Sequence, residues 1–184
     1  GMDEKEYANA ILDGCLEWGT LGMVGDGANP QKYLIGLEAI KKHGGLGIPI
    51  FKPREFNLDI IKRFKAAEDA GALAVGIDID AASFKTMSMK GQAVGPKTIE
   101  ELQELKSYLK VPFILKGIMN VESALSAIEA GADAIVISNH GGRVMDHMPG
   151  TAEVLPEIAN AVAGRIKVLA DGGIREGVDI LKML

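Results

Sequence analysis

One short segment combines residue types that could move a proton and hold an anion. It reads Ser138-Asn139-His140-Gly141-Gly142-Arg143, and it leaves an apolar run and turns through two glycines. A histidine can take up a proton at about pH 7, and an arginine offers a planar fork of donors to a carboxylate. His140 and Arg143 therefore predict an acid–base group beside an anion anchor. The alternative is a hydrogen-bonded turn histidine followed by a surface arginine.

A second glycine-rich segment, Asp171-Gly172-Gly173-Ile174-Arg175, suits a phosphate group. Its glycines let the backbone approach a ligand closely, the helix that follows would begin with free N–H groups, and Arg175 adds a positive charge. Upstream, Lys116 lies near the end of an apolar run, where it could either meet an anion or extend to solvent. Asp78 could pair with His140 or accept hydrogen bonds in a turn or cap.

Six short apolar runs could supply the buried strands that position these residues. Each run is followed by a turn and then by a helical pattern. Parallel strands that are buried on both faces of a sheet need apolar residues at every position, which these runs provide, so the predicted fold class is α/β. The runs cover residues 21–24, 47–51, 73–79, 113–118, 134–138 and 166–170.

Capping residues predict where helices begin between these runs. Thr98 with Glu101 has the spacing of a capping box, and Asn120 precedes an amphipathic run. Two further N-caps are expected at Asn29, which precedes a proline, and at Asn57. The helices should therefore start soon after the carboxyl end of each strand.

Polar residues at the carboxyl ends of the runs distinguish between two α/β architectures. A doubly wound sheet gathers its ligand groups at one crossover, whereas a (β/α)8 barrel collects them from many consecutive strands. Polar or charged residues lie at or near the carboxyl ends of the third to sixth runs, so the sequence predicts a barrel of the TIM type. Asp78, Asp80, Lys116, Ser138 to His140 and Asp171 are placed at or near these ends, and we expect His140 and Arg143 to face the same cavity as Lys116 and Asp171.

Composition excludes several classes of protein. The 184 residues are 47% hydrophobic, which suits a single domain over residues 1–184 and excludes disorder. The net charge of −5 contains no long block of either sign, so no nucleic acid is expected as a partner. The apolar runs are too short to cross a membrane. The lone Cys15 indicates a reducing compartment, for which we expect the cytoplasm, and no metal site is expected.

Four segments together resemble the FMN-dependent α-hydroxy acid oxidases and dehydrogenases, such as glycolate oxidase and lactate oxidase. They are Leu115-Lys116-Gly117-Ile118, the SNHGGR run at 138–143, the 150–158 stretch from Gly-Thr to Leu-Pro-Glu-Ile, and Asp171 to Arg175. Order and spacing match over residues 70–184. The stretches Gly25 to Pro30 and Asp78-Ile79-Asp80 are similar to a bacterial branch. The resemblance implies a TIM barrel with FMN at the carboxyl ends of its strands.

The resemblance also implies roles for individual residues. The net reaction would be oxidation of a small 2-hydroxy acid to a 2-oxo acid, with two electrons passed to FMN. Where the family has a glutamine and a tyrosine, this chain has Ile50-Phe51-Lys52, and Lys52 could replace the tyrosine as an anion contact. The implied roles are His140 as base with Asp78 as its carboxylate partner, Arg143 as the substrate carboxylate contact, Lys116, Ser138 and Asp171 as flavin contacts, and Gly172, Gly173 and Arg175 as phosphate contacts.

The chain is short for a complete barrel, and three functional interpretations remain. A TIM barrel needs about 250 residues, and six strand–helix units are predicted here rather than eight, as in a barrel truncated at both ends. The first interpretation is a flavoenzyme, or a piece of one, with its catalytic half present. The second is an inactive domain that binds no FMN and pairs its open strand edges in a homo-oligomer. The third is another phosphate-binding barrel enzyme, either a flavin isomerase or an aldolase with Lys116 as a Schiff base.

Overall fold

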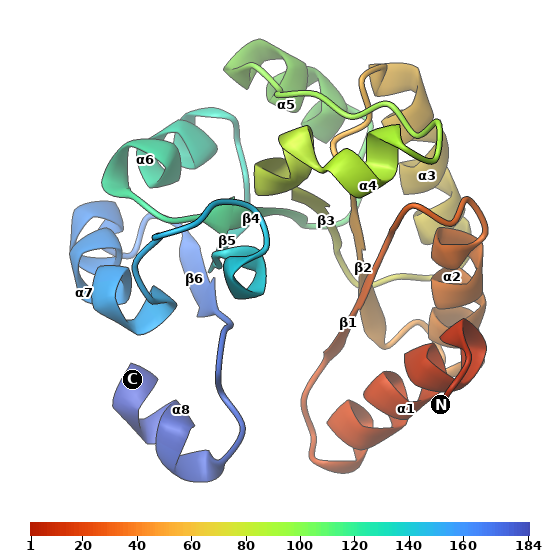
Figure 1. Ribbon diagram of the computed structural model, residues 1–184, viewed down its shortest axis with the longest axis horizontal. Helices are drawn as coiled ribbons and strands as arrows, with labels where there is room; N and C mark the ends of the chain where they lie inside the picture. The colour runs from red at the N-terminus through yellow and green to blue at the C-terminus, as the bar shows by residue number, and fades with distance from the viewer.

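The computed structural model describes residues 1–184 and contains one parallel sheet in the order β1-β2-β3-β4-β5-β6. Neighbours in sequence are neighbours in the sheet, without the reversal of order that defines a doubly wound fold. The sheet curls into half of a barrel, with β1 and β6 at its two ends (Figure 1). The predicted class and barrel architecture are confirmed. The strands are β1 (Gly22–Gly25), β2 (Gly47–Phe51), β3 (Val75–Asp78), β4 (Phe113–Ile118), β5 (Ala134–Ile137) and β6 (Lys167–Ala170).

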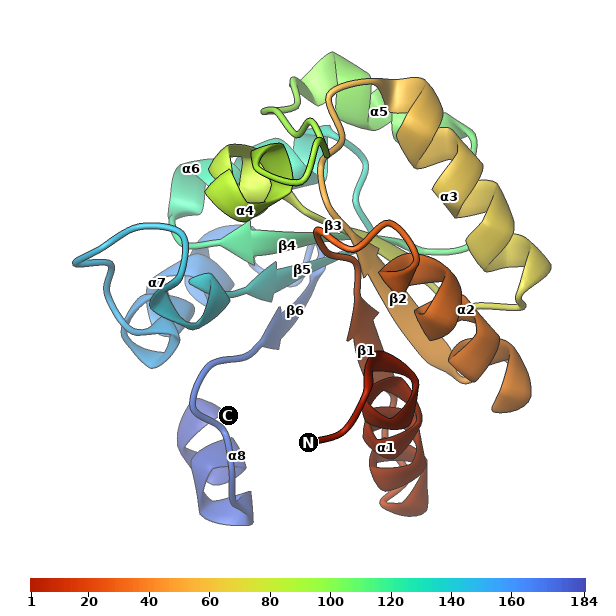
Figure 2. The same cartoon turned by 45° about the vertical axis from the view of Figure 1, so that its right-hand side comes forward.

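Helices alternate with the strands; α2, α3, α5, α6 and α7 cover the outer, convex side of the sheet, whereas α8 extends away from it beyond β6 (Figure 2). An additional helix precedes the first strand, and two short 3₁₀ helices follow β3 and β5 at the site described below. The helices are α1 (Glu4–Glu17), α2 (Lys32–Lys42), α3 (Asn57–Asp69), α4 (Lys85–Ser88), α5 (Ile99–Ser107), α6 (Val121–Glu129), α7 (Thr151–Val162) and α8 (Gly177–Met183), with η1 (Ile79–Ser83) and η2 (His140–Gly142).

Alternate strand residues pack on opposite faces of the sheet, and both faces are apolar. The larger core lies between the sheet and the helices and includes Phe51, Phe113 and Ile135. A smaller cluster on the concave face includes Ile50 and Ile114. Because both faces are buried, every position of a central strand needs an apolar residue, which explains the continuous runs in the sequence.

Strand boundaries differ from the predicted runs where the backbone changes direction. β2 and β4 match their predicted runs residue for residue. β3 ends at Asp78 rather than at Ile79, because Ile79 already begins η1. β5 ends at Ile137, which leaves Ser138 in the turn before η2. The polar residues of the predicted site therefore lie at the strand ends and in the turns that follow them.

Two of the four predicted caps are confirmed and two are wrong. Thr98 accepts a hydrogen bond from the Glu101 N–H, and Asn120 accepts one from Ser123. The Asn29 side chain accepts a hydrogen bond from the Gln31 N–H in a local turn. The helix α2 therefore begins at Lys32, two residues after Pro30. The Asn57 side chain donates to Glu104 at 2.7 Å instead of capping its own helix. Both deviations come from competing side-chain hydrogen bonds.

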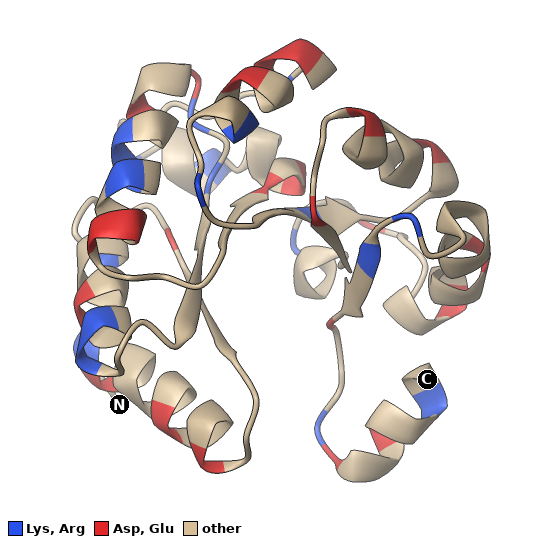
Figure 3. Ribbon diagram, turned by 180° about the vertical axis from the view of Figure 1, so that it is seen from behind, with Lys and Arg blue, Asp and Glu red and all other residues tan.

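Positions of Lys and Arg and positions of Asp and Glu are interspersed along the outer helices (Figure 3). None of the helices combines the length and the apolar character that a membrane crossing requires.

A charged contact joins α1 to the end of α2. His43 Nε2 lies 2.7 Å from the Asp13 carboxylate, and His43 Nδ1 lies 2.7 Å from the Ala39 carbonyl oxygen. The hydrogen bond to Asp13, followed by the one to Ala39, raises the pKa of His43 above its ordinary value of 6.5. The same hydrogen bond lowers the pKa of Asp13 below 3.8. The contact therefore stabilises the packing of α1 most strongly when both groups are charged.

This contact predicts a pH-dependent contribution to stability. A raised histidine pKa stabilises the fold fully below pH 6.5 and loses its effect as the pH rises through the folded-state pKa. The lowered pKa of Asp13 makes the contribution fall again in acid, below 3.8. We expect the melting temperature of the native chain to exceed that of a His43→Gln variant near pH 6, with the difference shrinking toward about pH 9. A difference that stays constant with pH would contradict this assignment.

Candidate active site

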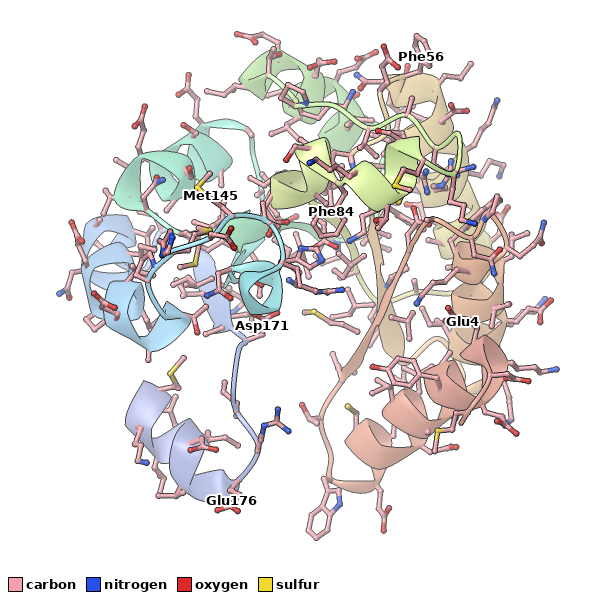
Figure 4. All side chains as sticks on the ribbon, viewed as in Figure 1. Glu4, Phe56, Phe84, Met145, Asp171 and Glu176 are labelled. Carbon is pink, nitrogen blue, oxygen red and sulfur yellow. The ribbon has the colours of Figure 1, made fainter.

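A cavity of about 760 Å³ lies at the carboxyl ends of the strands. Its volume falls within the range of about 300–1,000 Å³ that is usual for small-molecule sites. Lys116, His140, Arg143 and Asp171 all line it, which confirms that they share one cavity. Phe84 and Asp171, both labelled in Figure 4, border it from the segments that follow β3 and β6.

Each strand ends in a polar residue at or beside this cavity. The backbone there leaves the sheet, so side chains from six different strand ends converge on one space, as in TIM-barrel sites. Five of the six residues belong to the cavity lining, and the sixth, Ser138, accepts a hydrogen bond from Lys116. In strand order the residues are Asp26, Lys52, Asp78, Lys116, Ser138 and Asp171.

His140 is buried at the start of η2 and is held from both sides of its ring. Its Nδ1 lies 3.0 and 3.1 Å from the two carboxylate oxygens of Asp80. Its Nε2 lies 3.2 Å from the Lys52 ammonium. The ring of Phe84 packs against the imidazole with a centroid distance of 4.7 Å. The imidazole therefore has a fixed orientation at the cavity wall.

The contacts determine which ring nitrogen of His140 carries the proton. A lysine ammonium is a donor only, so the nitrogen that faces Lys52 must accept. The remaining nitrogen, Nδ1, then carries the hydrogen and donates it to the Asp80 carboxylate. In this arrangement Nε2 is the acceptor, and it faces the Lys52 ammonium at the cavity wall.

The pairing of His140 with Asp78 needs correction. The shortest distance between these side chains is 3.9 Å, which is too long for a hydrogen bond. Asp78 instead binds Lys52 at 2.6 Å, with both side chains at least nine-tenths buried. The physical reason is the turn into η1, which moves Asp80 toward the imidazole and leaves Asp78 at the strand end. The sequence places Asp80 at a strand end but assigns it no role.

Lys116 joins three oxygen atoms from three strand ends. Its Nζ lies 2.6 Å from Ser138 Oγ, 3.1 Å from Asp171 Oδ2 and 3.5 Å from Asp78 Oδ1. The contact with Ser138 is a hydrogen bond, and the two carboxylates lie at ion-pair distance from the same ammonium. A Schiff-base lysine needs a free amine, so the geometry does not favour the aldolase interpretation.

The predicted anion contacts differ in how close they lie to the cavity. Arg143 is exposed and lines the cavity, and its Nε donates to the His140 carbonyl oxygen at 2.9 Å. Its two terminal nitrogens carry the remaining donors. Gly172 also lines the cavity, whereas Gly173 and Arg175 are exposed residues beyond its lining. The anion anchor predicted at Arg143 therefore faces the site, and the phosphate segment reaches it through Gly172.

A buried charge network supports the backbone of Lys52. Asp26 accepts from Arg54 Nη2 at 2.6 Å and from the Lys52 N–H at 3.3 Å. Arg63 approaches the same carboxylate at 3.8 Å, and burial lowers the pKa of its guanidinium. Sequence patterns did not reveal this network, because Asp26 lies 28 or more residues from either arginine and no motif joins them.

Metal ligand types also meet beside the cavity. Asp78, Asp80 and His140 each offer one ligand atom, and these atoms lie within 4.8 Å of one another. The Lys52 ammonium already lies between Asp78 and His140, so a divalent cation would have to displace it. The Lys52 ammonium thus already supplies the positive charge beside the Asp78 carboxylate.

Known proteins share both the sequence and the fold of this chain. The sequence profile of the FMN-dependent dehydrogenases matches residues 81–184. The chain is 33% identical to a peroxisomal (S)-2-hydroxyacid oxidase of Arabidopsis thaliana over 76% of its own length and 47% of the relative. It is 38% identical to the L-lactate oxidase of Lactobacillus jensenii over 80% of its own length and 37% of the relative.

Solved structures of mandelate oxidase have a similar fold. One, a variant with 2-hydroxy-phenylacetamide, superposes with a TM-score of 0.80 at 31% identity, covering 96% of this chain and 55% of that protein. Another mandelate oxidase structure gives a TM-score of 0.77 at 28% identity, over 98% and 57%. The chain thus spans about half the length of the proteins to which it is similar.

Proposed function

The chain belongs to the FMN-dependent dehydrogenase family, whose cofactor is FMN, and from that membership we propose that its cavity oxidises a 2-hydroxy acid to a 2-oxo acid. One observation carries the proposal. His140 and Arg143 lie on one loop and line the same cavity, which places a candidate base beside a candidate carboxylate anchor. Relatives named for 2-hydroxyacids, lactate and mandelate support a small substrate of this class.

The polar groups on the β4 to β6 side fit a flavin nucleotide. Lys116 offers an ammonium to the carbonyl oxygens of the ring, and Asp171 offers a carboxylate to ribityl hydroxyls. Gly172 lies where the backbone tolerates no side chain, because an added Cβ would lie 3.0 Å from Thr151 Oγ1 and φ is +97°. We propose that these residues hold the cofactor, with Ser138 positioning Lys116. When bound, FMN supplies the acceptor for two electrons.

The residues around His140 account for the proton transfer. Arg143 would grip the substrate carboxylate through its terminal nitrogens and present the substrate carbon to His140. His140 Nε2 would then take a proton from the substrate as the two electrons leave it. Asp80 would stabilise the imidazolium that results, through the hydrogen bond to Nδ1. The substrate hydroxyl would lose the second proton to solvent, so that two protons and two electrons leave the substrate, the electrons passing to FMN.

Lys52 must change its hydrogen bonds for this step. In the structure its ammonium binds Asp78 and faces His140 Nε2, the atom that would receive the proton. A substrate oxygen entering the cavity could accept from Lys52 in place of the imidazole. Lys52 would then act as the anion contact that replaces the family's tyrosine.

Cofactor reduction tests the proposed function directly. FMN is titrated into the chain, and the loaded sample is mixed without oxygen with lactate, glycolate and mandelate. We expect at least one of these acids to bleach the flavin absorbance, because a bound hydroxy acid passes its electrons to FMN. FMN that is bound but reduced by no acid of the series would contradict the proposal.

The same samples test cofactor affinity and self-association. We propose that residues 1–184 fold as one unit, bind FMN weakly or not at all and form a homo-oligomer, because the outer edges of β1 and β6 are unpaired and the phosphate contacts are few. Light scattering should give a mass above the 19.5 kDa of one chain. A monodisperse monomer would refute the self-association.

We also propose a bacterial and cytoplasmic origin. The lone Cys15 suits a reducing compartment, and Asp78-Ile79-Asp80 resembles a bacterial branch of the family. Fractionation of the source cells tests the location, and recovery of the protein in an organelle would contradict it.

A further inference from the structure

We propose that Asp80, and not Asp78, is the positioning residue that holds His140 in its Nδ1–H tautomer. The inference rests on the proposed function for its catalytic meaning, but the geometry stands by itself. Both carboxylate oxygens of Asp80 lie within 3.1 Å of His140 Nδ1. The two side chains are nearly buried, with 12% and 6% exposure, so water competes little for this hydrogen bond.

The contact of Lys52 with Nε2, on the other side of the His140 ring, determines which tautomer Asp80 holds. Lys52 donates toward Nε2 and cannot accept, so the imidazole hydrogen must lie on Nδ1. Asp80 is the acceptor for that hydrogen. Lys52 and Asp80, which carry opposite charges, therefore contact different ring nitrogens, and together they leave Nε2 as the acceptor and Nδ1 as the donor.

Asp78 makes no hydrogen bond to the imidazole, from which it lies 3.9 Å away, and it pairs with two ammonium groups instead. Its Oδ2 accepts from Lys52 at 2.6 Å, and its Oδ1 lies 3.5 Å from Lys116. Asp78 thus balances the two ammonium groups of the cavity. The two carboxylates lie two residues apart in the sequence but serve different partners.

A glycine in β4 makes the space that Asp80 occupies. A Cβ added at Gly117 would lie 2.5 Å from Asp80 Cγ and 2.7 Å from Asp80 Oδ1. The φ of Gly117 is +99°, and the register of β4 with β5 shifts between Lys116 and Ile118 at this point. A side chain here would meet both the backbone constraint and the carboxylate. The bulge therefore gives Asp80 its position against the imidazole.

Nitrogen NMR of the 184-residue chain, labelled with ¹⁵N in its histidine rings, tests the proposal without FMN or turnover. The chain has three histidines, and a His140→Gln variant assigns the signals of His140. We expect the native chain to show a protonated Nδ1 and an unprotonated Nε2. Asp80→Ala should mix the two tautomers, whereas Asp80→Asn, whose amide oxygen still accepts, should retain the native pattern.

Two more variants separate this role from a general structural effect. Gly117→Ala should mix the tautomers with Asp80 still in the sequence, while Asp78→Asn should leave Nδ1 protonated. Unchanged signals from His43 and His147 show in each case that the fold is intact. A native pattern in Asp80→Ala, or mixed tautomers only in Asp78→Asn, would overturn the proposal.

Failure of the proposed function would give a different result. If no 2-hydroxy acid reduces bound FMN but Asp80→Ala still mixes the tautomers, the positioning role holds and the reaction is wrong. If the native protein is active, Asp80→Ala should slow flavin reduction by less than the ~10²–10⁴-fold expected for loss of the base itself. Reduction at the native rate in a variant with mixed tautomers would remove the catalytic meaning of the contact.

Discussion

Replacing His140 by alanine is expected to slow the reduction of bound FMN by a 2-hydroxy acid by about 10²–10⁴-fold. The imidazole lies at the cavity wall with Nε2 as an acceptor, so its removal takes away the proton acceptor of the reaction. Arg143 stays on the same loop and would still bind the substrate carboxylate. The rate of flavin bleaching at saturating substrate should therefore fall, while the substrate concentration at half-saturation changes little.

Two variants of the same loop serve as controls for His140. Arg143→Ala should mainly weaken substrate binding, because it removes the proposed carboxylate contact. His147→Asn should reduce FMN at the native rate, since His147 is exposed and outside the cavity lining, and asparagine tolerates its positive φ of 62°. A His140→Ala variant that binds substrate more weakly but reduces FMN normally would refute the role as base.

The Asp26→Ala variant is expected to lower the free energy of unfolding by about 3–5 kcal/mol. The Asp26 side chain is fully buried and Arg54 is 96% buried, with a 2.6 Å contact between them. Removing the carboxylate leaves the Arg54 and Arg63 guanidinium groups beside each other without their shared counter-ion. A typical domain has only about 5–15 kcal/mol of stability, so this loss is a large fraction of the total.

An exposed ion pair on α3 provides the matched control. Asp69 lies 3.4 Å from Lys65, but 67% and 77% of these side chains are exposed. Asp69→Ala should change the stability by less than about 1 kcal/mol, because water and salt screen the pair. Urea denaturation of both variants measures the difference. Equal effects from Asp26 and Asp69 would show that the buried network contributes no more than a surface pair.

Local sequence determined much of the fold. The run Phe113–Ile118 forms β4 residue for residue, and Thr98 with Glu101 caps α5, because side-chain burial and capping act over a few neighbouring residues. Asn29 and Asn57 show the limit of such patterns. Each of these side chains makes a different hydrogen bond from the predicted cap, and Asn57 donates to Glu104, 47 residues away.

The candidate site, too, could be predicted from the sequence only in part. His140, Arg143, Lys116 and Asp171 could be placed in one cavity from the sequence, since parallel strands bring all their carboxyl ends to the same side. The choice between Asp78 and Asp80 could not. It depends on the turn of η1 and on the space above Gly117, which is contributed by a strand 37 residues further along the chain.

The sequence by itself therefore determined the parallel half-barrel and the residue types that line its cavity, because apolar periodicity and strand-end chemistry are local properties. Only the tertiary structure decided the partners of each charge. Asp26 pairs with Arg54, and Lys52 pairs with Asp78. Asp80 contacts His140, which lies 60 residues further along the sequence. Which charge pairs with which is set by distances of a few ångströms between separate strand ends, since Coulomb and hydrogen-bond energies depend on distance in space.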